Sequence, residues 1–233
     1  MRALLKPILL GAAFILAVTP ALAVEGVVMD WAPDSYGWET DYDPVTHFST
    51  AGSELTVVGK IDVFYDPFLD LDPIATEYTF IFEGLISDGT EDWGGGMLYT
   101  TYSDGQFAIY EDPSNNADFG ENPPNAVSPS TFTDGELILE GILTGFFTWG
   151  MPGPGGYAAT YEADFEFTGP MGGEFYNRVQ GCYGKTGGAT SDDPGIGIPA
   201  GYSYVVDGHL TVEDCRPIGA EENNWGGVKQ LFR

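Results

Sequence analysis

Three pairs of aspartates in this sequence have the type and spacing of candidate metal ligands. Each pair is followed by a proline, as in Asp-Tyr-Asp-Pro, Asp-Leu-Asp-Pro and Asp-Asp-Pro. Two carboxylates within one turn of irregular chain, next to backbone carbonyls, are the hard oxygen ligands that calcium prefers. The alternative is an ordinary turn, because Asp-Pro often opens one. No EF-hand spacing is present, so a structural calcium ion is a hypothesis for Asp41, Asp43, Asp70, Asp72, Asp192 and Asp193.

A second group of carboxylates, Glu162, Asp164 and Glu166, alternates along one stretch of chain. On a β-strand, neighbours in this series would lie roughly 6.6–7 Å apart, close to the separation in inverting glycosidases. Any outward polar face of a strand gives the same spacing, however. A glycan hydrolase is therefore the least favoured function, and no catalytic residue is assigned to this group.

Nucleophilic catalysis has little support in the sequence. No G-x-S-x-G motif is present, and the only histidines are His47 and His209. Apart from the calcium hypothesis no cofactor is expected. We expect a protein without enzymatic activity.

Aromatic residues are numerous, with 5 tryptophans and 13 tyrosines. Several of them on one exposed face would form a carbohydrate-binding surface, because aromatic rings present flat apolar area with a polar edge. The alternative is that they fill the core of a β-sheet. Both readings stay open.

The two cysteines, Cys182 and Cys215, are even in number in a chain that carries an export signal, described below. A disulfide between them is the first expectation for an oxidising compartment. In the chain-entropy model, closing a loop of this length stabilises the fold by roughly 3–4 kcal/mol.

The elements that must position these residues are β-strands. Between Tyr157 and Thr168 apolar residues occupy every second position, which is typical of a strand with one buried and one exposed face. The same analysis predicts strands at 26–31, 54–65, 77–85, 97–102, 106–111, 134–149, 174–180 and 202–213. Ser103-Asp104-Gly105 is expected to join two of them as a hairpin, because glycine accepts the backbone of such turns. The turn at 151–156 should pair the strands on its two sides, and 112–130 and 181–201 are read as loops.

This pattern predicts an all-β fold, an antiparallel β-sandwich with jelly-roll and immunoglobulin-like topologies both open. We expect one domain over 24–215 and an appended tail at 216–233. No long stretch with helical periodicity occurs outside the N-terminal segment.

The N-terminal segment has the pattern of a secretory signal peptide. Arg2 and Lys6 precede an apolar run at 8–18, and Ala-Leu-Ala ends at Ala23. We predict cleavage after Ala23 and a periplasmic or extracellular location. No membrane span is expected in the remaining chain.

The formal net charge of the chain is −27. So acidic a protein is a poor partner for nucleic acid or for an anionic membrane. A cation, a cationic partner, a cell-surface component or a glycan remains compatible with this charge.

Several strand and turn patterns carry a resemblance to known proteins. They are the segments 55–59, 78–85 and 132–141, and Phe167-Thr168 followed by Gly172-Gly173. The chain resembles exported bacterial β-sandwich proteins of unknown function and is similar to the ectodomains of PEP-CTERM-type surface proteins. It lacks their Pro-Glu-Pro sorting signal, and its 225–233 segment resembles the ends of other exported bacterial proteins. The resemblance implies export and a β-rich fold, and supplies no catalytic residue. The predicted function is a secreted surface, matrix or binding protein, with a carbohydrate-binding module as the first alternative.

Overall fold

The structure is a computed structural model that describes residues 26–31, 35–120 and 129–215, without the side chains of 214 and 215. The predicted signal peptide and the tail at 216–233 lie outside this range. The elements are β1 (Gly26–Trp31), β2 (Ser35–Glu39), β3 (Tyr42–Asp43), β4 (Phe48–Ser49), β5 (Glu54–Lys60), β6 (Val63–Phe64), β7 (Glu77–Asp92), β8 (Leu98–Tyr102), β9 (Gly105–Asp112), β10 (Glu136–Gly153), β11 (Gly156–Gly169), α1 (Glu174–Val179), β12 (Cys182–Ser191), η1 (Pro194–Ile196) and β13 (Tyr204–Cys215).

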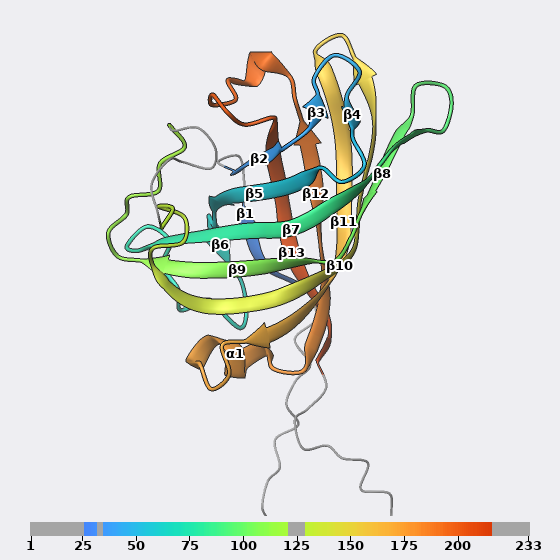
Figure 1. Ribbon diagram of the computed structural model, residues 1–233. Coiled ribbons are helices and arrows are strands. Elements are labelled where there is room, and N and C mark those ends of the chain that lie inside the picture. The colour runs from blue at the N-terminus through green and yellow to red at the C-terminus, as the bar shows by residue number, and fades with distance from the viewer. Residues whose placement is uncertain (1–25, 32–34, 121–128, 216–233) are drawn as a thin grey trace, which may run out of the picture.

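The main sheet is antiparallel and closes on itself (Figure 1). Around the ring β2 pairs with β5 and β5 with β7, then β8 and β9 connect β7 to β10, and β10 pairs with β11 and β11 with β12. β13 then pairs with both β12 and β2, which completes the ring. The prediction of an antiparallel all-β fold is confirmed. The predicted division into two facing sheets is not what the hydrogen bonds show, because the meander closes into a barrel-like sheet.

Two positions around the ring are occupied by pairs of shorter strands. β8 and β9 both lie between β7 and β10, so together they form one interrupted strand. The hairpin predicted at Ser103-Asp104-Gly105 is therefore wrong, and the segment is a break within a strand line. β1 and β2 likewise both pair with β13, along different parts of its length.

The predicted strand at 157–168 is confirmed as β11. Its side chains alternate between buried and exposed positions along nearly the whole strand. It pairs with β10 through the predicted turn, so that hairpin is confirmed as well. Two other readings were wrong: 174–180 contains the short helix α1, and the loop expected at 181–201 begins with β12.

The end of the ring at which α1 lies is filled by aromatic side chains, and Phe175 and Tyr176 of α1 pack with them. Trp31 lies 4.8 Å from Phe80 between ring centroids, and Phe107 lies 4.9 Å from Phe165. In each pair the two residues come from strands that are not paired with each other, so these contacts link strands through the interior of the ring. Burial of such large apolar groups is the main stabilising term for the fold.

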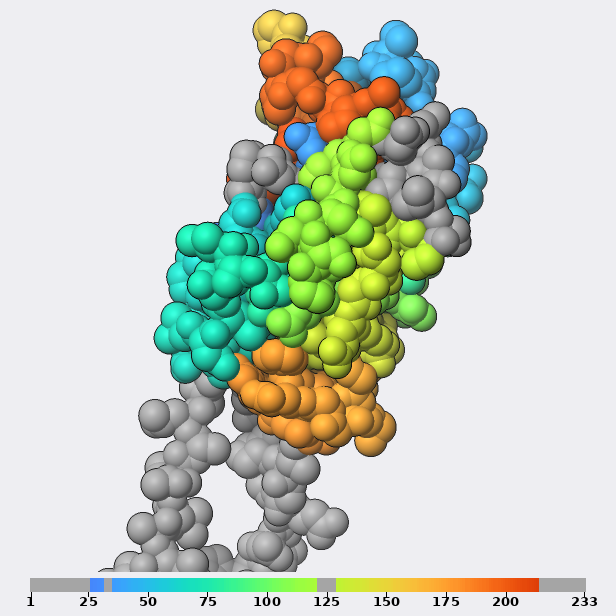
Figure 2. Space-filling view, turned by 90° about the vertical axis from the view of Figure 1, so that its left-hand side faces the viewer, coloured from blue at the N-terminus to red at the C-terminus, as the bar shows by residue number. Residues whose placement is uncertain are grey.

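Helix α1 lies at this same end of the ring, next to the segment at 65–76 (Figure 2). Arg178 of α1 forms a two-pronged ion pair with Asp70 and also lies 2.8 Å from Glu174. Its guanidinium is 5.0 Å from the ring centre of Phe175. These contacts attach α1 to the segment at 65–76. Helix α1 does not cover the opposite end of the ring.

Part of the outer surface of the sheet is also covered. Val58 and Ile81 face outward but are buried in a second cluster with Phe132 and Tyr202. Glu77 holds the covering loop in place, because its carboxylate accepts a hydrogen bond from the backbone N–H of Ala117 at 2.8 Å. Much of the aromatic content is thus core, as one of the two sequence readings expected.

No helix among the residues that the structure describes has the length and apolar character needed to cross a membrane.

Candidate functional site: a tyrosine- and threonine-lined cavity

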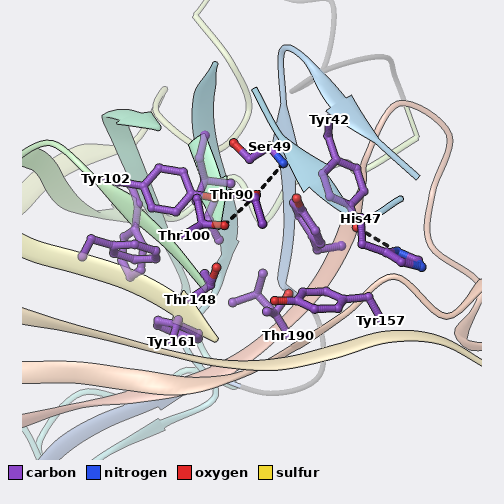
Figure 3. Close-up of a pocket in the computed structure, with 16 residues that line it drawn as sticks. Tyr42, His47, Ser49, Thr90, Thr100, Tyr102, Thr148, Tyr157, Tyr161 and Thr190 are labelled. Atoms are coloured by element: carbon purple, nitrogen blue, oxygen red, sulfur yellow. Dashed lines mark hydrogen bonds between the residues drawn. The ribbon is translucent and has the colours of Figure 1, made fainter. Parts of the chain in front are cut away.

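A cavity lies inside the ring at the end opposite α1 (Figure 3). Its volume is about 30 Å³. By that measure roughly two water molecules would fit. Five tyrosines, four threonines, one serine and one histidine supply its polar atoms: Tyr42, Tyr102, Tyr157, Tyr161, Tyr204, Thr90, Thr100, Thr148, Thr190, Ser49 and His47. Apolar side chains, among them Val57, Phe82 and Phe146, supply the rest of the wall.

Gly145 decides which residues of β10 face this cavity. Its φ of 64° is in the left-handed region, which favours glycine. The pairing of β10 with β11 shifts between Thr144 and Phe147, so the strand bulges there. Beyond the bulge Phe146 and Thr148 line the cavity. Strict alternation from Leu143 would place Phe147 on the buried face, and the bulge reverses that assignment.

The mouth of the cavity is covered by the hairpin of β3 and β4. This hairpin is a separate two-stranded sheet, outside the main hydrogen-bonded ring. Asp43 shapes its turn, since its carboxylate accepts hydrogen bonds from the N–H of Val45 at 2.8 Å and the hydroxyl of Thr46 at 2.8 Å. His47 follows with a φ of 62°, an uncommon backbone conformation for a residue other than glycine. The turn thereby places the His47 side chain at the cavity.

Asp192, just after β12, binds the hairpin to the ring. Its Oδ2 lies 2.7 Å from His47 Nδ1 and accepts a hydrogen bond from the Tyr42 hydroxyl at 2.6 Å. Its other oxygen accepts the backbone N–H of Tyr157. The His47 ring also stacks on Tyr157, with centroids 5.6 Å apart and an interplanar angle of 18°. One carboxylate therefore joins β3, the β3–β4 turn and β11, and we call this set the latch.

A buried carboxyl group, that of Glu39, lies behind the cavity wall. Its side chain accepts hydrogen bonds from the hydroxyls of Ser49 and, at 2.9 Å, Tyr204. Ser49 Oγ in turn lies 2.6 Å from Ser87 Oγ. Burial raises the pKa of Glu39, although hydrogen bonds from Ser49 and Tyr204 favour its charged form. None of the ion pairs found among the described residues involves Glu39.

The tyrosines around the cavity are held in their neutral form. Burial is the largest cause that raises the pKa of Tyr102 and Tyr204 well above the usual value, and the nearby Glu39 adds to it. Burial likewise raises the pKa of Tyr157 to about 12. These hydroxyls therefore stay protonated at neutral pH, and each can both donate and accept a hydrogen bond.

The candidate calcium ligands are not brought together. Asp72 accepts the N–H of Ile74 at 2.9 Å, and Asp193 accepts that of Gly195 at 2.7 Å. Asp70 pairs with Arg178, at the end of the ring far from the cavity. No group of three or more histidine, cysteine or acidic side chains converges anywhere in the described part of the chain. Calcium binding by Asp41, Asp43 and the other aspartates stays a prediction, and hydrogen bonds account for the turns without it.

The carboxylates considered for glycan hydrolysis face outward. Glu162, Asp164 and Glu166 are exposed on β11. Their cross-strand neighbours include Phe147 for Glu162 and Lys185 for Asp164. They belong to the outer surface of the ring and do not line the cavity.

The two cysteines are directly opposite each other. Cys182 begins β12, Cys215 ends β13, and the two are partners in the antiparallel register. Cys182 is buried, and the side chain of Cys215 lies outside the described side chains. The register supports the predicted disulfide, which stays a prediction.

Sequence reasoning missed the cavity. Thr90, Thr148 and Thr190 lie in strands or stretches where threonine is common, so no motif marks them. His47 was noted only as one of two histidines. The one available signal was its place beside an Asp-Pro turn, since a tight turn can present a side chain in a fixed direction.

Comparison of the chain with protein-family models, with characterised proteins and with solved structures gave no match. The chemistry of the site therefore rests on its geometry. His47 Nδ1 is engaged by Asp192 and Tyr42, and among the described residues no hydroxyl other than that of Tyr42 contacts the histidine through a hydrogen bond. Thr90 and Thr100 hydroxyls are 2.8 Å apart and bond each other. The arrangement offers neutral donors and acceptors on an apolar wall, which suits binding.

Proposed function

We propose that the protein is a non-enzymatic binding protein that takes a small, uncharged, partly apolar molecule into this cavity. The observation that carries the proposal is the division of the ring interior. One end is filled by apolar aromatic packing, and the other holds an open space lined by hydroxyl groups. Closed eight-stranded sheets can hold one small ligand at such a place.

The residues that line the cavity indicate the chemical character of the ligand. Leu55, Val57, Phe82, Phe146 and Val206 offer apolar contact, and the hydroxyl groups offer a few oriented hydrogen bonds. Binding sites for small molecules commonly combine these two features. A charged ligand would be disfavoured, because leaving water costs several kcal/mol unless an opposite charge compensates. None of the residues that line the cavity is a carboxylate, a lysine or an arginine.

Entry of a ligand larger than water requires the β3–β4 hairpin to move. The hairpin lies outside the ladder of the main sheet. It is held by the latch at the Tyr42 and His47 side and by hydrogen bonds of Ser49 in β4 to the ring. Its displacement would open the cavity without breaking the ring. The local geometry thus supports a cover whose movement would widen a small cavity.

Export and a disulfide are part of this proposal. The basic and apolar N-terminal pattern ending at Ala23 supports export. The opposed positions of Cys182 and Cys215 support a bond that an oxidising compartment would form.

The proposal is tested by titrating the chain with N-phenyl-1-naphthylamine, a neutral and largely apolar probe whose fluorescence rises when it leaves water. We expect a saturable rise with one probe per chain. Small neutral competitors such as indole should reverse it. A linear, non-saturable response would contradict a defined internal site.

A further inference from the structure

A group of aromatic side chains lies on the outside of the ring, away from the cavity. Trp93, in the β7–β8 hairpin, is 60% exposed, and Trp149 on β10 is 43% exposed. Tyr99 lies between them, Phe147 is two positions before Trp149 on β10, and both are partly exposed. We call these four residues the aromatic platform. Figure 1 shows the β7–β8 hairpin extending beyond the closed sheet, which leaves this side open to solvent.

The rings of the platform are held in place. Trp93 stacks on Tyr99 with centroids 4.3 Å apart and an interplanar angle of 28°. Its indole Nε1 donates a hydrogen bond to Glu91 Oε2 at 3.0 Å. Tyr99 in turn lies 5.6 Å from Phe147 and is opposite Trp149 in the strand register. A rigid aromatic group loses little conformational freedom when it binds, so this platform is preorganised.

Carboxylates flank the platform on both sides. Glu91 of β7 is opposite Tyr99, and Glu162 of β11 is opposite Phe147. Both are exposed. The Thr101 hydroxyl adds a polar group, bonded to Asp88 at 2.8 Å. The platform is thus a strip of aromatic rings with hydrogen-bond acceptors along its edges.

We propose that the aromatic platform binds a neutral, linear oligosaccharide. A sugar ring can stack its C–H face on Trp93 or Trp149 while its hydroxyls donate to the carboxylates of Glu91 and Glu162. Neighbouring strands lie about 4.8 Å apart and alternate residues of one strand about 7 Å apart, so the platform can contact more than one sugar ring.

Other occupants fit less well. An apolar partner would bury Glu91 and Glu162 without a counter-charge, which is costly. An anionic polysaccharide would meet these carboxylates and a chain of net charge −27. The same charge opposes contact with a second copy of the chain. A neutral ligand rich in hydroxyl groups meets none of these penalties.

The test uses the full chain and a panel of neutral hexasaccharides, of β-1,4-linked glucose, β-1,4-linked mannose and β-1,3-linked glucose, with hexagalacturonate as the anionic comparison. We expect at least one neutral hexasaccharide to bind in calorimetry and to change tryptophan fluorescence, and hexagalacturonate not to bind. Trp93→Ala and Trp149→Ala should each raise Kd about tenfold or more, as loss of a central aromatic contact does.

Tyr183→Ala is the matched control, because Tyr183 is 42% exposed on β12 and outside the platform. It should leave Kd unchanged, and both platform variants should keep their binding of N-phenyl-1-naphthylamine in the cavity. The proposal is overturned if none of the neutral hexasaccharides binds, or if Trp93→Ala and Trp149→Ala bind like the unmodified chain. Concentration-dependent dimerisation that Trp149→Ala abolishes would also overturn it, by assigning the face to a second copy.

Discussion

His47 Nδ1 and Asp192 Oδ2 lie 2.7 Å apart although 145 positions separate the two residues in the chain. This contact, together with the Tyr42 hydroxyl, fixes the β3–β4 hairpin over the cavity. It is one of two points at which the cover and the ring meet, and Ser49 of β4, hydrogen-bonded to Thr90, Glu39 and Ser87, is the other. The behaviour of the cover should therefore depend on Asp192.

Asp192→Ala should release the hairpin. A hydrogen bond to a charged group contributes about 1.5–3 kcal/mol. The free energy needed to open the hairpin should therefore fall by about that amount. Backbone amides of 42–49, and that of Tyr157, should then exchange with solvent faster, while the other amides of β11 change little. Asp193→Ala is the control, because Asp193 only caps the turn at Gly195. Equal exchange in both variants would contradict the role of the latch.

Glu39→Gln should change how stability depends on pH. The pKa of Glu39 is raised in the folded protein by burial, so the folded state holds this proton more tightly than the unfolded chain does. Its stabilising contribution is fully present below the carboxyl group's ordinary pKa and is lost as pH rises through the raised value. The variant lacks that loss, so its stability relative to the unmodified chain should increase from acidic to neutral pH.

Urea unfolding over that pH range measures the difference. Glu54→Gln, at the exposed start of β5, serves as the control and should run parallel to the unmodified chain. A constant offset between Glu39→Gln and the unmodified chain at every pH would show that Glu39 does not titrate as proposed.

Gly208→Ala tests the packing below the cavity. A Cβ at this position would lie 2.0 Å from the Tyr161 hydroxyl and 2.8 Å from the backbone oxygen of Gly187. Overpacking of this kind costs about 1–3 kcal/mol of unfolding free energy. Tyr161→Phe in the same chain removes the closest atom and should recover part of that loss. Additive destabilisation in the double variant would contradict the contact.

The predicted disulfide can be tested by mass. Cys182 and Cys215 are cross-strand partners, so the oxidised chain should be lighter by two hydrogens and should gain them on reduction. Replacing both cysteines by serine should lower stability by roughly 3–4 kcal/mol in the chain-entropy model. Free thiols in protein secreted under oxidising conditions would refute the bond.

The sequence predicted strands well where alternation was uninterrupted. β11 alternates between buried and exposed residues because Tyr157, Ala159 and Tyr161 all face inward. On β10 the same reasoning assigned Phe147 to the wrong face. A left-handed glycine at 145 inserts one residue into the pattern, and alternation alone does not reveal which glycine does this.

Closure of the sheet and the site itself could not be predicted. Closure depends on β13 pairing with both β12 and β2, and strand patterns do not specify which distant edges meet. The cavity likewise needs His47 and Thr190 to lie near each other from opposite parts of the chain. No local motif carries that information.

The most direct test of ligand binding inside the ring is a pair of substitutions on one strand. Thr148 lines the cavity, whereas Thr144 of the same strand is exposed on the outside. Thr148→Phe fills the cavity, and Thr144→Phe makes the same chemical change on the other face. In titrations with N-phenyl-1-naphthylamine, Thr148→Phe should lose saturable binding and Thr144→Phe should retain it. Binding that survives Thr148→Phe in a folded protein would contradict the account.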